Sequence, residues 1–140
     1  MKVLLAVDGS AFTQKMLDYL VSHPELLVDS RQYTALSVQA PLPPRARALV
    51  GKADVDAYYA EEFDKVLNAV VQTLSQHGVS VDRATRIGSA GEEIAKFAQD
   101  GQFDLVVMGS HGQSSFSNLV MGSVATKVLA ACKVPVLLIR

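Results

Sequence analysis

Hydrophobic residues along this chain alternate between short continuous runs and sets spaced three or four positions apart. The run KVLLAV, residues 2–7, is typical of a strand buried on both faces, and it ends in Asp8-Gly9. From Ser10 the apolar positions take helical spacing as far as His23-Pro24, which predicts a helix. The remaining sequence continues the alternation. Further strands are predicted at residues 33–38, 79–87, 103–108 and 134–139, and further helices at 59–74, 89–98 and 122–132.

Two segments carry more local expectations. Ser89 followed by Glu92 resembles a capping box, in which the serine side chain bonds to the backbone at the start of a helix. Residues 39–52, QAPLPPRARALVGK, contain three prolines, a glycine and three basic residues. This composition predicts a long loop inside one domain rather than a linker between two domains.

Strands that alternate with helices at this spacing indicate a parallel sheet covered by helices on both faces. The expected fold class is therefore α/β, with residues 1–140 as a single domain built on a five-stranded, flavodoxin/Rossmann-like sheet. If the strand order is 3-2-1-4-5, the connections reverse direction between the first and fourth strands, and a crevice opens at their carboxyl ends. Asp8 and residues 109–112 would then lie at that crevice, where such folds bind ligands.

Composition narrows the classes of function. The chain has 140 residues, near the usual size of one domain, with 49% hydrophobic and 19% charged residues and a net charge of -1. These values argue against disorder and against sequence-independent nucleic-acid binding. The apolar runs are far shorter than the roughly 20 residues that span a membrane, and no export signal is evident. A single cysteine, Cys132, fits a reducing compartment, so a cytoplasmic location without membrane association is expected.

The segment MGSHGQSSFSNLVMGS, residues 108–123, is rich in small residues and lacks Asp, Glu, Lys and Arg. We expect Gly109 and Gly112 to permit positive φ angles and close approach to a ligand, with backbone N–H groups facing a concavity. Gly122 and Ser123 stand where the last helix begins, and unpaired N–H groups there favour phosphate. A strand-to-helix loop with ordinary turn glycines and an N-cap serine would use the same residues.

The glycine spacing points to a family. Gly109-x-x-Gly112, nine residues and then Gly122-Ser123 follow the G-2x-G-9x-G-[S/T] pattern, and the chain resembles the nucleotide-binding subgroup of the universal stress protein (UspA-type) family. The segments KVLLAVDGS, GEEIAKFA and FDLVVMG are also similar to that family. The resemblance covers nearly the whole chain and is weakest at residues 40–60.

This resemblance implies an adenine-nucleotide site. In the family, the acid at the position of Asp8 binds the ribose hydroxyls, and the backbone at the position of Val38 contacts adenine. Met108 and Gly109 would line the ribose-phosphate path. The remaining residues would surround the phosphates through N–H and hydroxyl groups: Gly112, Gly122, Ser123 and Val124. The expected ligand is ATP, ADP or AMP, with any Mg²⁺ arriving on the nucleotide.

The resemblance implies a stress-response regulator that binds nucleotide without significant catalytic turnover. Two alternatives stay open: a dimeric interaction protein that binds no nucleotide, and a slow adenine-nucleotide hydrolase. His111 lies in the loop, but no Ser-His-Asp or Cys-His grouping accompanies it in the motif. The first strand-helix turn lacks both the Walker A and the G-x-G-x-x-G patterns, which disfavours Walker-type hydrolysis and a dinucleotide site.

Two further expectations concern assembly and affinity. Residues 134–139 would form an apolar edge strand, and the resemblance implies that this strand, from Val134 to Ile139, pairs across a two-fold axis in a homodimer. Residues 105–126 carry no formally charged side chain. Modest ATP affinity, little preference for ATP over ADP and negligible hydrolysis are therefore expected. Basic side chains could compensate if the proline-rich loop folds over the site: Arg45, Arg47 and Lys52.

Overall fold

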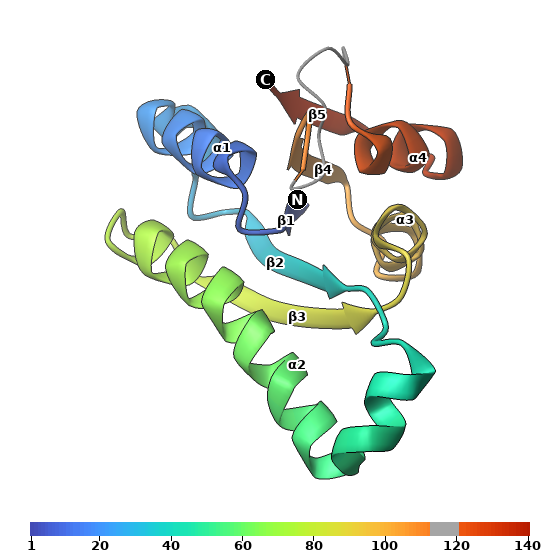
Figure 1. Ribbon diagram of the computed structural model, residues 1–140. Helices are drawn as coiled ribbons and strands as arrows, with labels where there is room; N and C mark the ends of the chain where they lie inside the picture. The colour runs from blue at the N-terminus through green and yellow to red at the C-terminus, as the bar shows by residue number, and fades with distance from the viewer. Residues whose placement is uncertain (113–120) are drawn as a thin grey trace.

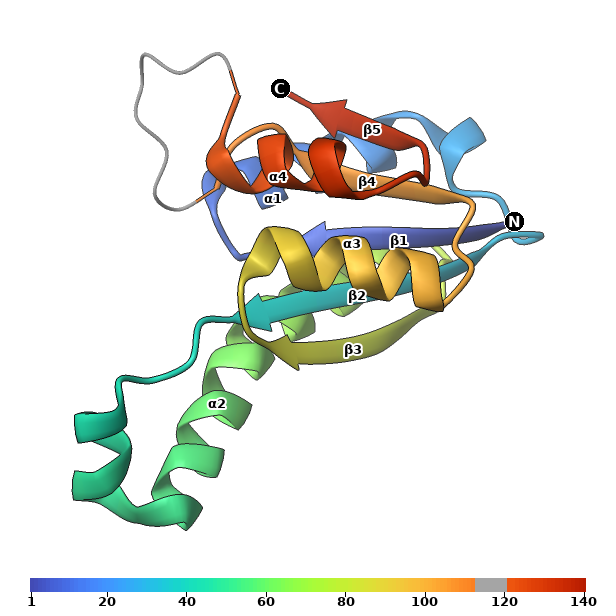
Figure 2. The same cartoon turned by 90° about the vertical axis from the view of Figure 1, so that its right-hand side faces the viewer.

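The computed structural model describes residues 1–112 and 121–140, and it arranges them as a sheet between two layers of helices (Figures 1 and 2). The strands are β1 (Lys2–Val7), β2 (Gln32–Gln39), β3 (Val81–Ile87), β4 (Leu105–Gly109) and β5 (Val136–Ile139). The helices are α1 (Ala11–Ser22), α2 (Pro44–Ser75), α3 (Ala90–Asp100) and α4 (Ser123–Ala131), with a 3-10 turn at Pro24–Leu26. The hydrophobic pattern therefore predicted the five strands, α1, α3, α4 and the second part of α2, but not the helical residues 44–58.

The strands are parallel and lie in the order β3-β2-β1-β4-β5, which confirms the expected order. Near its carboxyl end, β1 pairs through Val7 with Ser37 of β2 and through Ala6 with Met108 of β4. The chain leaves β1 toward β2 on one side and later returns to β4 on the other. This reversal is the position at which open α/β sheets bind ligands.

Two apolar cores cover the two faces of the sheet. Alternate residues of β1 divide between them, because successive side chains of a strand point to opposite faces. Val3 and Leu5 join the core under α1 and α2, whereas Leu4 and Ala6 join the core under α3 and α4. Leu4 and Leu5 are both fully buried. Burial on both faces explains why the β1 sequence is apolar without alternation.

Residues 44–52 belong to α2, so the loop expected over residues 39–52 is wrong for most of its length. Pro43 is the N-cap of α2 and Pro44 its first residue, positions at which a backbone N–H has no partner within the helix. The alanines, arginines and leucine that follow favour a helix. Gly51, with φ 75° and ψ 165°, then turns the chain and divides α2 into two segments. Residues 44–58, here called the arm, project beyond the sheet in both views (Figures 1 and 2).

Helix ends depend on backbone and histidine contacts. Ser89 is the N-cap of α3, but its side chain makes no capping hydrogen bond, so the expected capping box is wrong. Ser89 is exposed, and water can satisfy its hydroxyl instead. Near the end of α2, His77 Nδ1 lies 2.9 Å from the Thr73 carbonyl oxygen. Gly78 follows with a φ of 77°, which confirms the helix stop predicted at His77-Gly78.

Candidate functional site

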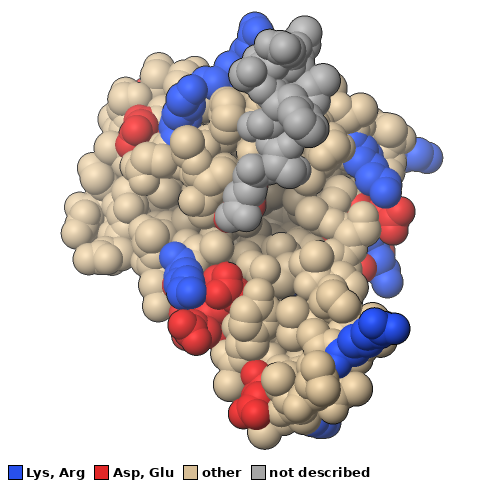
Figure 3. All heavy atoms as spheres, in the orientation of Figure 1, with Lys and Arg blue, Asp and Glu red and all other residues tan. Residues whose placement is uncertain are grey.

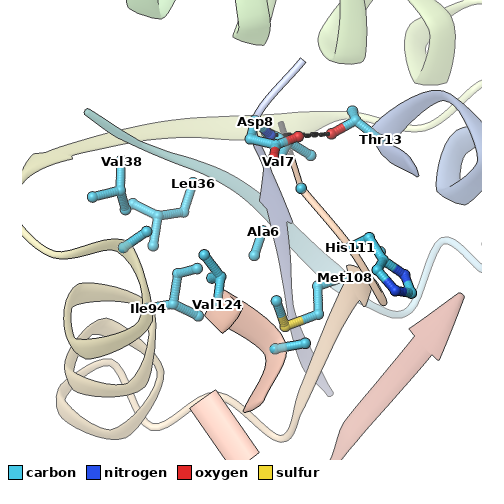
Figure 4. A pocket seen from close by; sticks show the side chains of 14 residues that line it. Ala6, Val7, Asp8, Thr13, Leu36, Val38, Ile94, Met108, His111 and Val124 are labelled. Carbon is cyan, nitrogen blue, oxygen red and sulfur yellow. Dashed lines mark hydrogen bonds between the residues drawn. The ribbon is translucent and has the colours of Figure 1, made fainter. Parts of the chain in front are cut away.

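A pocket opens at the carboxyl ends of β1, β2 and β4, beside α3 and α4 (Figure 4). Six of the eight residues predicted from the sequence line it: Asp8, Val38, Met108, Gly109, Gly112 and Val124. Gly122 and Ser123 are not among the described residues that line it. The lining residues that sequence reasoning did not assign to a ligand are Ala6, Val7, Thr13, Leu36, Ala90, Ile94, His111 and Ala125.

The pocket has an apolar side and a polar side. In Figure 4, Leu36, Val38 and Ile94 gather at one side, whereas Asp8 and His111 lie away from them. A ligand with a flat apolar ring and a hydroxylated, charged tail matches this division. Adenine nucleotides have this character.

The enclosed volume is small, about 80 Å³. Pockets for small molecules usually measure roughly 300–1,000 Å³. A nucleotide at this position would therefore extend out of the pocket toward solvent, or lining side chains would shift to admit it.

The carboxylate of Asp8 is held by short-range hydrogen bonds. Its Oδ1 accepts a hydrogen bond from the Ser10 N–H at 2.9 Å and another from the Thr13 hydroxyl at 2.9 Å. The Asp8 N–H donates back to Thr13 Oγ1 at 3.0 Å, and Thr13 is buried. These bonds orient the carboxylate at the end of β1. A ribose hydroxyl is a suitable donor to such a group.

Thr13 is the polar residue that the sequence reasoning missed. It lies on the first turn of α1, five positions after Asp8, so its side chain can reach back to the end of β1. The sequence signal that could have identified Thr13 is a hydroxyl residue five positions after an acid at the end of a strand.

The three motif glycines each meet a different neighbour at close range. A Cβ on Gly109 would lie 2.7 Å from Phe12 Cβ, and one on Gly112 would lie 2.7 Å from Asp8 Oδ2. A Cβ on Gly122 would lie 2.9 Å from His111 Cα. Positive φ angles, expected for Gly109 and Gly112, do not occur at either position. Close approach, rather than backbone conformation, is the reason for glycine here.

Gly109 serves packing as well as the pocket. The close Phe12 atoms belong to α1 and include the Phe12 carbonyl oxygen, 3.2 Å from a Cβ placed on Gly109. The absence of a side chain therefore lets α1 pack directly on the end of β4. A ligand role alone does not account for this glycine.

The start of α4 lies next to the loop that follows β4. Gly122 is the N-cap of α4, and its N–H donates to the Ser110 carbonyl oxygen at 2.7 Å. Ser123 is the first residue of the helix and is exposed, and Val124 lines the pocket. The unpaired N–H groups of the first helical turn are thus close to the pocket. The uncharged residues 113–120, from Gln113 through Asn118 and beyond, lie outside the described part of the chain.

Val38 occupies a position with a free strand edge on one side. Pairing between β1 and β2 ends at Val7 and Ser37, and Val38 is the next residue of β2. On its other side, Val38 pairs with Arg86 of β3. A backbone contact from Val38 to a ligand therefore requires no strand pairing to break.

His111 lies at the polar side of the pocket. Its ring centroid is 4.8 Å from that of Phe12, and its Nδ1 is 2.9 Å from Ser110 Oγ. Ser110 is buried and does not line the pocket. The Ser110–His111 pair is therefore not arranged as a nucleophile and base facing a ligand.

No metal-binding cluster of His, Cys, Asp and Glu occurs in residues 1–112 and 121–140. Three basic residues that could have compensated for the uncharged loop, Arg45, Arg47 and Lys52, belong to the arm, and none of them lines the pocket. None of the helices described is both long enough and apolar enough to cross a membrane. Among the described residues, the pocket lining thus offers hydrogen-bonding groups and an apolar surface, and it includes no Lys or Arg.

Comparison with known proteins identifies relatives over the full length. The sequence model of the Universal stress protein family matches residues 1–140. Universal stress protein Slr1230 of Synechocystis sp. is 32% identical over 139 residues, which cover 99% of this chain and 42% of that protein. YxiE of Bacillus subtilis is 26% identical over 147 residues, which cover 99% of this chain and 98% of YxiE. The chain thus spans less than half of the Synechocystis relative and nearly all of YxiE.

Solved structures share the fold. MJ0577 of Methanocaldococcus jannaschii gives a TM-score of 0.81 at 24% identity, with coverage of 99% of this chain and 94% of MJ0577. An Archaeoglobus fulgidus universal stress protein solved with dAMP gives 0.65 at 20% identity, covering 100% of this chain and 98% of that one. An Arabidopsis thaliana universal stress protein family protein with AMP bound gives a TM-score of 0.70 at 16% identity, covering 99% of this chain and 90% of that chain. A universal stress protein in complex with cAMP gives a TM-score of 0.69 at 20% identity, covering 100% of this chain and 97% of that chain.

Proposed function

The chain belongs to the universal stress protein family, and from this we propose that it is an adenine-nucleotide-binding regulatory protein of the stress response that acts without significant catalytic turnover. The observation that carries the proposal is the Asp8 carboxylate, oriented by Thr13 and the Ser10 N–H at the polar side of a pocket whose other side is apolar. Structures of the same fold that hold AMP, dAMP and cAMP support this ligand class.

The adenine ring would lie against Leu36, Val38 and Ile94, with the Val38 backbone as its hydrogen-bonding edge. The Asp8 carboxylate would accept hydrogen bonds from the ribose hydroxyls, beside Met108 and Gly109. The phosphates would extend past Gly112 toward the first turn of α4. Beside Gly122, the N–H groups of Ser123 and Val124, the Ser123 hydroxyl and the helix dipole would stabilise them there. Any Mg²⁺ would be bound through the phosphates.

Affinity for ATP should be modest. Charge-assisted hydrogen bonds are roughly twice as strong as neutral ones, and no Lys or Arg side chain lines the pocket among the described residues. Residues 1–112 and 121–140 place no Lys or Arg and no nucleophile–base pair in the pocket lining, so stabilisation of the transition state of hydrolysis would also be weak. The protein would thus bind ATP, ADP and AMP as a sensor rather than consume ATP.

We also propose a homodimer through the last strand. β5 pairs with β4 along one edge only, and its residues 136–138 are half-buried. Pairing of β5 with β5 of a second copy would cover this edge. Residues 1–140 would form one universal stress protein domain, and a cytoplasmic location fits the single cysteine, Cys132.

Calorimetric titration of the intact chain with AMP, ADP and ATP tests the function, and Asp8→Asn is the decisive variant. Asparagine keeps the shape of the side chain but loses the charge and one acceptor oxygen. We expect the parent chain to bind all three nucleotides and Asp8→Asn to bind them at least about tenfold more weakly. A parent chain that binds none of them would favour a role through protein contacts alone.

A further inference from the structure

The arm, residues 44–58, has apolar side chains that are exposed to solvent in the described part of the chain. Leu49 is 85% exposed, Val50 47% and Tyr58 43%, and these are three of the seven exposed large apolar residues in the described part of the chain. A groove of about 350 Å³ lies between the two segments of the arm. Leu42 and Val55 lie deeper in this groove.

The apolar positions of the arm have helical order. Ala46, Leu49 and Val50 follow one another at i, i+3 and i+4 on the first segment, and Val55 and Tyr58 at i and i+3 on the second. All five line the groove. Such stripes normally pack against another helix. Here Leu49, Val50 and Tyr58 remain open to solvent, whereas Val55 is buried.

Charge is segregated between the two segments. Residues 44–52 carry Arg45, Arg47 and Lys52 and no acid, whereas residues 53–58 carry Asp54 and Asp56 and no base. None of these five takes part in the ion pairs found among residues 1–112 and 121–140. Figure 3 shows basic atoms on the side of the arm formed by its first segment and acidic atoms on the other side.

We propose that the arm binds the arm of a second copy of this chain, with the first segment of each copy against the second segment of the other. A two-fold axis makes every contact occur twice, so both basic segments would face acidic segments. The same pairing would bury the exposed leucine, valine and tyrosine side chains. Its occupant is a second copy because the arm is complementary to itself in both charge and apolar pattern.

This interface is independent of the nucleotide pocket and of the β5 edge. If β5 also pairs, and the two two-fold axes are perpendicular and intersect, the arms would join two β5 dimers into a closed tetramer. If β5 does not pair, the arms alone would give a dimer. In either case, disruption of the arms should halve the mass of the particle.

Sedimentation velocity of the intact chain over a range of micromolar concentrations tests the proposal with two charge-reversed proteins. One carries Arg45→Glu, Arg47→Glu and Lys52→Glu, and the other carries Asp54→Lys and Asp56→Lys. Each protein alone would place like charges against each other, and its association should weaken at least about tenfold. An equimolar mixture should recover the parent mass, because an all-acidic arm then meets an all-basic arm. Far-ultraviolet circular dichroism of each variant checks that the helices remain.

Recovery of mass on mixing, with loss in each variant alone, establishes the arm interface. Variants that keep the parent mass, or a mixture that stays at half mass, would overturn it, and the arm would then be a surface for a different protein. A Leu49→Asp variant provides a second measurement. It removes an apolar side chain from the proposed interface and leaves the five charged residues of the arm in place, so it should also halve the mass. AMP calorimetry reports on the pocket separately, so failure of nucleotide binding leaves this result unaffected.

Discussion

The Thr13 hydroxyl donates a hydrogen bond to Asp8 Oδ1 at 2.9 Å and accepts one from the Asp8 N–H at 3.0 Å. The two bonds connect the first turn of α1 to the residue that follows β1. Both groups of Asp8 are thereby satisfied by one buried side chain. The direction of the carboxylate, and with it the polar side of the pocket, depends on the docking of α1 against the sheet.

Thr13→Val removes both hydrogen bonds while nearly preserving side-chain shape. Because Asp8 then loses a donor to its carboxylate and an acceptor for its N–H, AMP affinity should fall roughly tenfold and the free energy of unfolding by about 1–3 kcal/mol. Calorimetry and urea denaturation measure the two effects. Thr13→Ser is the matched control and should behave like the parent. Equal AMP affinity in Thr13→Val would show that Thr13 does not position Asp8.

A side chain at Gly112 should block the proposed ligand path. A Cβ there would lie 2.7 Å from Asp8 Oδ2, so Gly112→Val places two methyl groups at the carboxylate. We expect nucleotide binding below detection by calorimetry, with the circular dichroism spectrum unchanged, and an intermediate loss for Gly112→Ala. If Gly112→Val binds nucleotide as tightly as the parent, the ligand lies elsewhere.

Gly109 should matter for stability more than Gly112 does. Gly109→Ala would bring a Cβ to 2.7 Å from Phe12 Cβ and 3.2 Å from the Phe12 carbonyl oxygen, and α1 would have to move. Overpacking of this kind costs about 1–3 kcal/mol of unfolding free energy. Urea denaturation of Gly109→Ala beside Gly112→Ala measures the difference. Equal stability in the two variants would count against the packing role of Gly109.

The β5 dimer can be tested by a charge at the sheet edge. Val136→Lys should give a particle of half the parent mass. The substitution replaces an apolar side chain by a charged one at the edge that would be buried in the dimer. Sedimentation velocity at micromolar concentration measures the mass. Leu129→Lys, on the exposed surface of α4, is the control and should leave the mass unchanged. A parent chain that is already monomeric, and unaffected by Val136→Lys, would rule out this assembly.

Nucleotide selectivity should be low because no Lys or Arg occurs among the described residues that line the pocket. Dissociation constants for ATP and ADP, with and without Mg²⁺, should agree within about tenfold, because no charge-assisted bond distinguishes the γ-phosphate. Phosphate release should stay at the background level over hours. Steady turnover near 1 per second, a common enzymatic scale, or nanomolar binding that requires the γ-phosphate would contradict this expectation.

Much of this protein follows from local sequence. A strand buried on both faces must be apolar at nearly every position, and a helix on a sheet must be apolar every three or four positions. The strand at KVLLAV and the amphipathic helices can therefore be predicted from the hydrophobic pattern alone. The glycine spacing and the family resemblance predicted that the motif glycines and Asp8 belong to the site. Six of the eight residues predicted for the site do line one pocket: Asp8, Val38, Met108, Gly109, Gly112 and Val124.

Tertiary structure decided what each of these residues touches. Sequence alone left open that Gly109 accommodates Phe12, that Gly112 faces Asp8 and that Thr13 orients the carboxylate. These facts depend on where α1 docks, which is set by burial summed over the whole core. The helical first segment of α2 was also missed, because proline disfavours a helix interior but suits its first turn. Local pattern thus determined the elements and the strand ends, whereas long-range packing determined the contacts that give the pocket its shape.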